Sequence, residues 1–172
     1  MSHEDHTQIY MTPAEVQDEG VLWLMLTFAA SMGKGGAEQV GRAQSDPYLK
    51  TYVSGWGLKK GDVGVVSRDE LGNVLGAAWL RLGGDGGQFK LSDADVPELA
   101  TAVIPAARGR GVGTVLMRRL IELATPHFRR VVLSAREENP AIRFYSRLGF
   151  RVVSTMKNRV GGDSFVMALD LG

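Results

Sequence analysis

The segment from Glu98 to Met117, ELATAVIPAARGRGVGTVLM, constrains the fold of this 172-residue chain more than any other. An apolar stretch typical of a strand, Leu99–Ile104, stops at Pro105, and a glycine-rich loop leads at once into a helical pattern over Val112–Ala124. Glycines let a backbone approach a ligand closely, and the first N–H groups of a helix have no partner within the helix. Because the helix dipole also favours an anion there, the segment predicts a strand–loop–helix unit suited to phosphate.

The loop does not match the two best-known phosphate-binding patterns. After Gly109-Arg110-Gly111 the next glycine comes one residue too early for the dinucleotide-binding fingerprint, and no Gly-Lys-Ser/Thr follows as in a P-loop. Arg108 and Arg110 would add charge-assisted contacts to a phosphate, although two arginines are often only a solvated surface. By themselves, the glycines fit an ordinary turn equally well.

The distribution of charge favours a phosphate-bearing ligand. The net charge of +1 hides a basic half, since the only acids between residues 108 and 151 are Glu122, Glu137 and Glu138. A ligand with several phosphates would suit this half, and so would RNA. The arginines in this stretch are Arg108, Arg110, Arg118, Arg119, Arg129, Arg130, Arg136, Arg143, Arg147 and Arg151.

The remaining pattern predicts helices, then an antiparallel run, then alternating strands and helices. Thr12-Pro13-Ala14-Glu15 has the form of a helix start with Thr12 as its cap, and this helix should run toward Met32. Asp46-Pro47 should open a second helix after a polar, glycine-rich loop. We expect a further helix at Pro140–Leu148, and strands at Val63–Ser67, Val74–Leu82, Leu99–Ile104, Val131–Ser134, Phe150–Thr155 and Ser164–Asp170.

Composition excludes several kinds of site. The sequence has no cysteine, which rules out disulfides, thiolate metal sites and a cysteine nucleophile. The three histidines, His3, His6 and His127, have no metal-ligand spacing, so we expect no metal. The most apolar run, Val21–Ala30, is about half as long as a membrane span and lacks the position and basic flank of a signal peptide. We expect it to be a buried helix of a cytoplasmic protein, with residues 1–8 flexible.

Two motifs, in this order, resemble the GCN5-related N-acetyltransferase (GNAT) family. Arg108-x-x-Gly111-x-Gly113 resembles the family's (Gln/Arg)-x-x-Gly-x-(Gly/Ala) pyrophosphate loop between a strand and a helix. Residues 139–150, NPAIRFYSRLGF, resemble its Asn-x-x-Ala or Asn-x-Ala start, its tyrosine near the helix end and its closing Gly-Phe. The resemblance implies one α/β (α+β) domain over residues 1–172. Its mixed, mostly antiparallel sheet would have about six to seven strands, splayed at the central strand and flanked by helices.

The resemblance also implies a co-substrate and the residues that bind it. Acetyl-CoA would bind to a core formed by residues 98–153. Backbone N–H groups of the loop would hold the pyrophosphate, and Ala102–Ile104 would pair with the pantetheine arm like an added strand. Asn139 would contact that arm, and Ala141 and Phe144 would line its wall, unless these two only pack their helix. The residues expected to bind the co-substrate are Ala102, Val103, Ile104, Arg108, Gly109, Arg110, Gly111, Val112, Gly113, Thr114, Asn139, Ala141, Phe144 and Tyr145.

Glu98 and Tyr145 are the candidate catalytic residues. Acyl transfer to an amine requires a neutral amine, a stabilised oxyanion and a proton for the leaving thiolate, and without cysteine direct attack in a ternary complex is simplest. Glu98 resembles the glutamate that some relatives use as the base, often through water; otherwise it is a strand-end carboxylate in solvent. Tyr145 resembles the tyrosine that faces the CoA sulfur, where a phenol with a pKa near 10 can protonate a thiolate; otherwise it packs in the core. A backbone N–H near Val103 or Ile104 would polarise the thioester carbonyl.

The sequence does not identify the acceptor. The resemblance places its site within residues 31–57, 79–90 and 156–164, whose aromatic side chains would form either a pocket for an amine or buried core. Asp93 and Asp95 would attract a cationic amine or would simply form a solvated loop. We expect a small-molecule amine or a peptide amine as acceptor, and neither nucleic acid nor a membrane as partner. A homodimer is compatible with the sequence.

Two other function classes stay open. One is a non-catalytic acyl-CoA-binding module that keeps the cofactor loop, against which Glu98 and Tyr145 argue. The other is an RNA-associated acyltransferase acting on charged tRNA through the basic half. The chain lacks the basic stretch with interleaved aromatic residues that would favour the second class.

Overall fold

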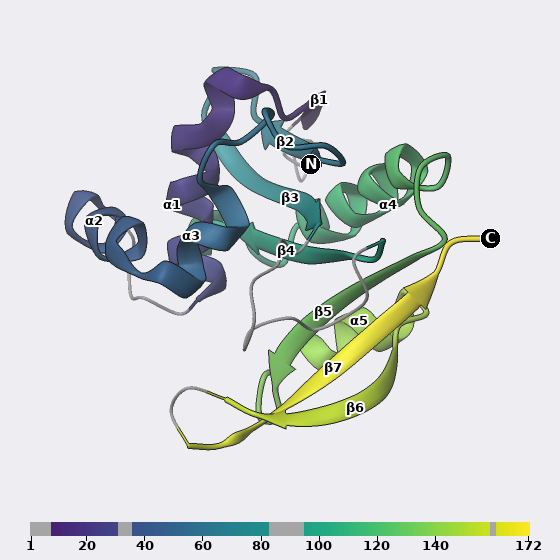
Figure 1. Cartoon of the computed structure of the whole chain (residues 1–172). Coiled ribbons are helices and arrows are strands. Elements are labelled where there is room, and N and C mark those ends of the chain that lie inside the picture. Colours follow the sequence, from purple (N-terminus) through teal and green to yellow (C-terminus); the bar gives the residue numbers. More distant parts are fainter. Residues whose placement is uncertain (1–7, 31–35, 83–94, 159–160) are drawn as a thin grey trace.

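The computed structural model describes residues 8–30, 36–82, 95–158 and 161–172 (Figure 1). Its strands are β1 (Tyr10–Pro13), β2 (Val63–Arg68), β3 (Val74–Leu82), β4 (Pro97–Val103), β5 (Arg130–Arg136), β6 (Arg151–Lys157) and β7 (Asp163–Asp170). They form one seven-stranded sheet in the order β1-β2-β3-β4-β5-β7-β6. Neighbouring strands are antiparallel except β4 and β5, which are parallel. The predicted mixed and mostly antiparallel sheet is confirmed.

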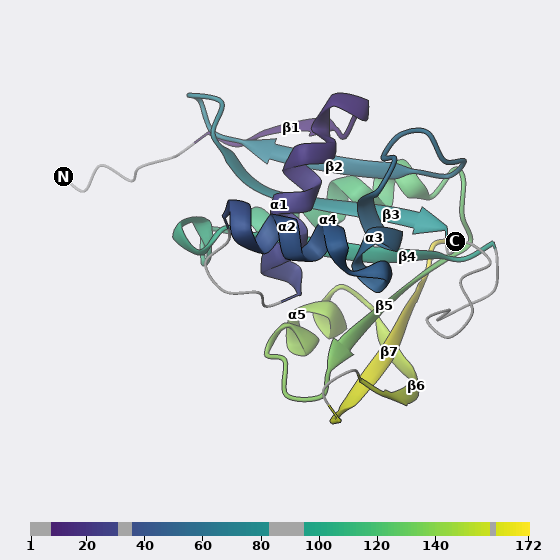
Figure 2. The same ribbon diagram turned by 60° about the vertical axis from the view of Figure 1, so that its left-hand side comes forward.

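Helices cover both faces of this sheet, and they are α1 (Glu19–Ala29), α2 (Ala37–Ser45), α3 (Pro47–Val53), α4 (Val112–Ala124) and α5 (Ala141–Arg147). Alternate residues of a strand face opposite sides of the sheet, so Leu99 of β4 packs in the core on the α4 side, whereas Ala100 packs with α1 and α3. Helix α5 shares the core of α4 and packs against β5 and β7. Figures 1 and 2 show α1, α2 and α3 together on the side opposite α4.

The first helix begins later than the sequence pattern suggests. Thr12 and Pro13 lie in β1, which pairs with β2, so the predicted cap at Thr12 is wrong. Helix α1 begins only after a 3-10 turn at Val16–Asp18. A capping box does form, but from Glu15, whose backbone N–H donates to the Asp18 carboxylate at 2.8 Å. Here the backbone hydrogen bonds that pair β1 with β2 override the local preference of Thr12-Pro13 for a helix start.

Of the next two helices, α3 agrees with the prediction and α2 corrects it. Helix α3 begins at Pro47 as expected, and the Asp46 carboxylate caps it by accepting the N–H groups of Tyr48 at 2.9 Å and Leu49 at 3.3 Å. Helix α2 lies where we expected a loop. Because Ala43 is the one residue of α2 that is fully buried, the sequence offers little apolar periodicity there.

The apolar run Val21–Ala30 falls within α1 and the turn that ends it, and it buries Leu22, Trp23, Met25 and Leu26, as predicted. Among the described residues, no helix is long and apolar enough to cross a membrane. Most of the predicted flexible start, residues 1–7, lies outside the described residues.

Strands β4 and β5 part soon after they meet. One pair of Cα partners, Glu98 and Val132, joins them, whereas β4 pairs with β3 along its whole length from Pro97 to Val103. Figures 1 and 2 both show β5 leaving β4 at a steep angle. The predicted splay at the central strand is therefore present, and it divides the sheet into β1–β4 and β5–β7–β6.

Candidate active site

A groove of about 770 Å³ lies along the splay. It is bounded by β4, the glycine loop, the first turn of α4, α5 and the end of α1. Except for Ile104 and Arg110, all the residues expected to bind the co-substrate line it. Other lining residues were not among those expected to bind the co-substrate, and they include Phe28, Ala29, Thr101, Arg136, Glu138 and Arg147.

The backbone of β4 presents unpaired polar groups to this groove. The Ile104 N–H donates to the Leu75 carbonyl at 2.9 Å, so it is committed to β3 and is not the predicted donor to a thioester. Antiparallel ladders alternate between residues that bond the partner strand and residues that face away from it. With Ile104 bonded to β3, the N–H and C=O groups of Thr101 and Val103 face the splay. The Val103 carbonyl accepts from Arg108 Nε at 3.3 Å, which leaves the Val103 N–H as a donor.

The glycine loop adopts a conformation that requires glycine. Gly109 and Gly111 both have φ of 78°, in the left-handed region that side chains with a Cβ rarely occupy. A Cβ added at Gly111 would meet no atom within 4 Å, so backbone conformation rather than crowding selects glycine there. The first bond within α4 runs from the Val115 N–H to the Gly111 carbonyl. The N–H groups of residues 112–114 therefore have no partner within the helix and lie at the groove wall.

Charged and polar side chains complete the groove. Arg108, Arg136 and Arg147 line it, together with Glu138. The side-chain oxygen of Asn139 accepts the Ala141 N–H at 2.9 Å at the start of α5. The amide NH₂ of the same side chain remains as a donor. The groove thus combines arginine side chains, N–H groups at the start of α4 and an amide donor near α5.

Phe144 packs over the start of α4. A Cβ built on Gly113 would lie 3.6 Å from the Phe144 ring and 3.8 Å from Val103, which are ordinary contact distances. The space at Gly113 therefore has room for alanine, in keeping with the Gly/Ala alternative of the motif. Both interpretations of Phe144 from the sequence apply, because its side chain packs against the core and also lines the groove.

A smaller cavity of about 140 Å³ adjoins the groove. Its wall includes Tyr48 and Tyr52 of α3, aliphatic residues of α1, and Leu133 and Ser134 of β5. Four residues line both spaces: Ala29, Thr101, Asn139 and Tyr145. We call this space the inner cavity.

Tyr145 lies where the groove and the inner cavity meet. No hydrogen bond joins its hydroxyl to any other described residue, and burial raises the pKa of Tyr145 to about 12. The hydroxyl is therefore protonated near neutral pH and can donate a hydrogen bond. It is also a weaker acid than an ordinary phenol, so the expected match between its basicity and that of a thiolate does not hold. A hydroxyl with this raised pKa is better suited to donating a hydrogen bond than to transferring its proton completely.

Glu98 is reached from the inner cavity through a tyrosine. It is partly buried on β4, paired with Arg81 of β3 and Val132 of β5, and is not the solvent-facing carboxylate of the alternative interpretation. The Tyr52 hydroxyl donates to Glu98 Oε2 at 2.9 Å, and the Tyr48 hydroxyl lies 3.0 Å from that of Tyr52. As far as the described residues extend, Glu98 does not itself line the inner cavity.

Comparison with known proteins identifies the family. The sequence model of the acetyltransferase (GNAT) family matches residues 37–150. The chain belongs to the GNAT family. The family prediction from the two motifs is thus confirmed. No curated protein sequence matches this chain significantly.

Solved GNAT structures share the fold over almost the whole chain. One is yncA of Salmonella typhimurium, a putative acetyltransferase solved with its cofactor acetyl-CoA, at 24% identity and a TM-score of 0.68, covering 96% of this chain and 95% of that chain. A GCN5-related N-acetyltransferase from Kribbella flavida is 26% identical with a TM-score of 0.65, covering 95% and 98%. The ribosomal-protein-S18-alanine N-acetyltransferase of Escherichia coli is 17% identical with a TM-score of 0.66, covering 96% and 96%.

Some aromatic residues of the expected GNAT acceptor region belong to the core instead. Trp56 and Trp79 are 1% and 0% exposed, so they cannot form an open aromatic pocket. Tyr48 and Tyr52 do line the inner cavity. Phe89 and Asp93 lie outside the described residues.

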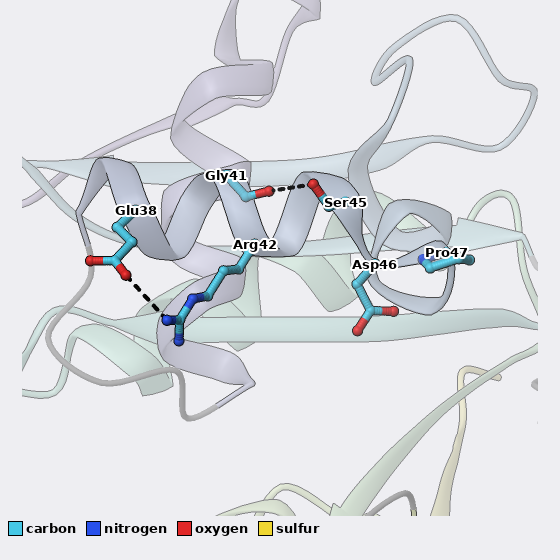
Figure 3. Close-up of a pocket in the computed structure, with 6 residues that line it drawn as sticks. All are labelled: Glu38, Gly41, Arg42, Ser45, Asp46 and Pro47. Carbon is cyan, nitrogen blue, oxygen red and sulfur yellow. Dashed lines mark hydrogen bonds and ion pairs between the residues drawn. The ribbon is translucent and has the colours of Figure 1, made fainter.

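A third hollow of this GNAT chain lies on α2, apart from the groove (Figure 3). Its charged groups already have partners: Arg42 pairs with Glu38 at 3.1 Å, and Asp46 caps α3. Ser45 donates to the Gly41 carbonyl within the helix. The ion pair is largely exposed, at 68% and 72% for the two side chains, which is typical of a solvated helix surface.

Proposed function

We propose that this protein transfers an acetyl group from acetyl-CoA to a primary amine by direct attack within a ternary complex. The observation that carries the proposal is the meeting of the groove and the inner cavity at Thr101, Asn139 and Tyr145. The groove has N–H donors and arginine side chains that suit CoA, and Tyr52 of the inner cavity contacts Glu98. A thioester and an amine that enter from the two spaces meet at this junction.

The groove fits CoA on chemical grounds. N–H groups of residues 108–114, with Arg108 beside them, would hold the pyrophosphate at the positive end of α4. The backbone groups of Thr101 that face the splay would pair with an amide of pantetheine as an added strand would. The Asn139 amide adds a further donor. Residues 98–153 thus form the proposed acyl-CoA-binding core, and the structure of yncA with acetyl-CoA supports this use of the fold.

The chemistry needs no covalent enzyme intermediate. The amine nitrogen attacks the thioester carbon, the C–S bond breaks, and the amine proton passes toward Glu98. The Val103 N–H would donate to the developing oxyanion, and the Tyr145 hydroxyl would donate to the leaving sulfur. The sequence has no cysteine that could carry the acetyl group.

The placement of the arginines favours a small phosphate-bearing ligand over RNA. Arg130 and Arg151 both contact Asp170, at 2.7 and 3.0 Å, and Arg119 pairs with Glu122 at 2.9 Å. These pairs neutralise part of the basic half. Three other arginines, Arg108, Arg136 and Arg147, line the groove rather than a separate surface.

Two measurements test the proposal. Acetyl-CoA at about 100 times its dissociation constant should stabilise the protein by about 2.7 kcal/mol, which raises the melting temperature by several degrees. A panel of spermidine, free amino acids, an alanine-terminated peptide and 2-phenylethylamine should then reveal an acceptor through release of the CoA thiol, which no protein cysteine can mask.

The outcomes separate the function classes. If acetyl-CoA gives neither a thermal shift nor calorimetric heat, the proposed function is wrong. If it binds but no amine releases CoA, the protein is an acyl-CoA-binding module. Release only in the presence of charged tRNA would support the RNA-associated alternative.

A further inference from the structure

Tyr52 stands between the inner cavity and Glu98. Its side chain lines the cavity, and its hydroxyl donates to Glu98 Oε2 at 2.9 Å. An amine in the cavity therefore meets a phenol before it meets the carboxylate. The two groups lie 46 residues apart in sequence and come together only because α3 packs across β4.

The fold holds Tyr52 in this position independently of its hydroxyl. Trp79 Nε1 donates to the Tyr52 carbonyl at 2.9 Å, which ties the backbone of α3 to β3. Arg81 donates to the carbonyl of Ser54, just beyond α3, at 2.7 Å. Arg81 is itself fixed by two 3.0 Å bonds to Asp62, with both side chains almost completely buried.

From this geometry we propose that Tyr52 is a further catalytic residue, which relays the proton of the acceptor amine to Glu98; the inference rests on the acetyltransferase function proposed above. As the nitrogen bonds to the acetyl carbon, its proton passes to the Tyr52 oxygen. In the same step the phenol proton of Tyr52 passes to Glu98 Oε2. Glu98 ends protonated, Tyr52 ends neutral, and no other reagent is needed.

The surroundings of Tyr52 favour such a coupled transfer. Burial and the neighbouring Glu98 carboxylate raise the pKa of Tyr52 well above its ordinary value, so a free phenolate does not form near neutral pH. Tyr52 must therefore release its own proton as it accepts another. The Tyr48 hydroxyl, 3.0 Å away, restricts how the Tyr52 hydroxyl can turn, and the two rings meet edge to face at 5.5 Å.

Tyr52→Phe isolates the hydroxyl, because the ring and the backbone bond from Trp79 remain. With the most active amine of the panel, we expect kcat to fall about 10²- to 10⁴-fold, while the affinity for acetyl-CoA measured by calorimetry stays unchanged. Tyr48→Phe leaves the bond from Tyr52 to Glu98 intact and should cost less. Tyr10→Phe, on the exposed strand β1, is the matched control and should leave kcat unchanged.

A double-mutant cycle separates a relay from a packing role. If Tyr52 acts only through Glu98, adding Tyr52→Phe to Glu98→Gln should slow the reaction no further, whereas a packing defect would slow it in either background. Undiminished kcat in Tyr52→Phe, or an equal further loss in the Glu98→Gln background, overturns the inference while the proposed function stands. A wild-type protein that is silent across the whole panel overturns both.

Discussion

Burial keeps Tyr145 protonated to a higher pH than an ordinary tyrosine, so the free energy of unfolding should depend on pH in alkaline solution. Burial raises its pKa to about 12, whereas in the unfolded chain a tyrosine loses its proton near pH 10. Between these values the unfolded state binds fewer protons than the folded state, so the free energy of unfolding falls as the pH rises. The stabilisation is complete below about pH 10 and is lost as the pH rises through about 12.

Urea unfolding at several pH values between about 9 and about 12 measures this effect. We expect the fall to be shallower in Tyr145→Phe than in the wild type. Tyr10→Phe, which alters an exposed tyrosine of β1, should reproduce the wild-type slope. Equal slopes for Tyr145→Phe and the wild type would show that Tyr145 ionises as an ordinary tyrosine.

Single residues were predictable where a motif names them. Arg108, Asn139 and Tyr145 stand at fixed places in the two motifs, and all three line the groove. Tyr52 could not be paired with Glu98 from the sequence, because their contact depends on how α3 crosses the sheet. The spacing of Tyr48 and Tyr52, one helical turn apart, does place both hydroxyls on one face and was the available signal.

At the level of elements, the loop before α4 carries the phosphate-binding hypothesis. Gly111→Asp should abolish detectable acetyl-CoA binding in calorimetry, because it puts a carboxylate where we place the pyrophosphate. Gly72→Asp is the matched control, since Gly72 also has positive φ and open space around it but lies in the turn between β2 and β3. Both variants should lose about 1 kcal/mol of stability from backbone strain, and only the first should lose the ligand. Unchanged affinity in Gly111→Asp would refute the loop assignment.

The accuracy of the predicted elements follows the strength of their apolar pattern. Helix α4 begins at Val112 and ends at Ala124 as predicted, because its buried residues recur at helical spacing. Helix α2 escaped prediction because it buries little beyond Ala43. The start of α1 was misplaced because pairing of β1 with β2, a long-range interaction, decides the conformation of Thr12. Local patterns therefore predict helices that bury an apolar stripe of side chains. They miss elements whose conformation depends on pairing with residues distant in the sequence.

For the whole molecule, a buried ion pair joins Arg81 of β3 to Asp62, in the segment between α3 and β2. Arg81 and Asp62 are 3% and 2% exposed, so Arg81→Met leaves an uncompensated buried carboxylate and should cost about 3–5 kcal/mol in urea unfolding. Replacing both partners, in Arg81→Met with Asp62→Leu, should recover much of that loss. The exposed pair of Arg42 with Glu38 supplies the control, since Arg42→Met should change stability by less than about 1 kcal/mol. A comparable loss of stability in Arg81→Met and Arg42→Met would mean that burial of the ion pair does not set the cost of breaking it.

The parting of β4 from β5 gives the protein a strand edge in its interior. An exposed edge invites other chains to pair with it and so to aggregate, and proteins usually blunt such edges with charge, proline or a bulge. Here Thr101 and Val103 of this edge line the groove, together with residues at the starts of α4 and α5. If acetyl-CoA binds there as proposed, its pantetheine arm covers this edge and occupies the place where a strand of a neighbouring molecule would otherwise pair.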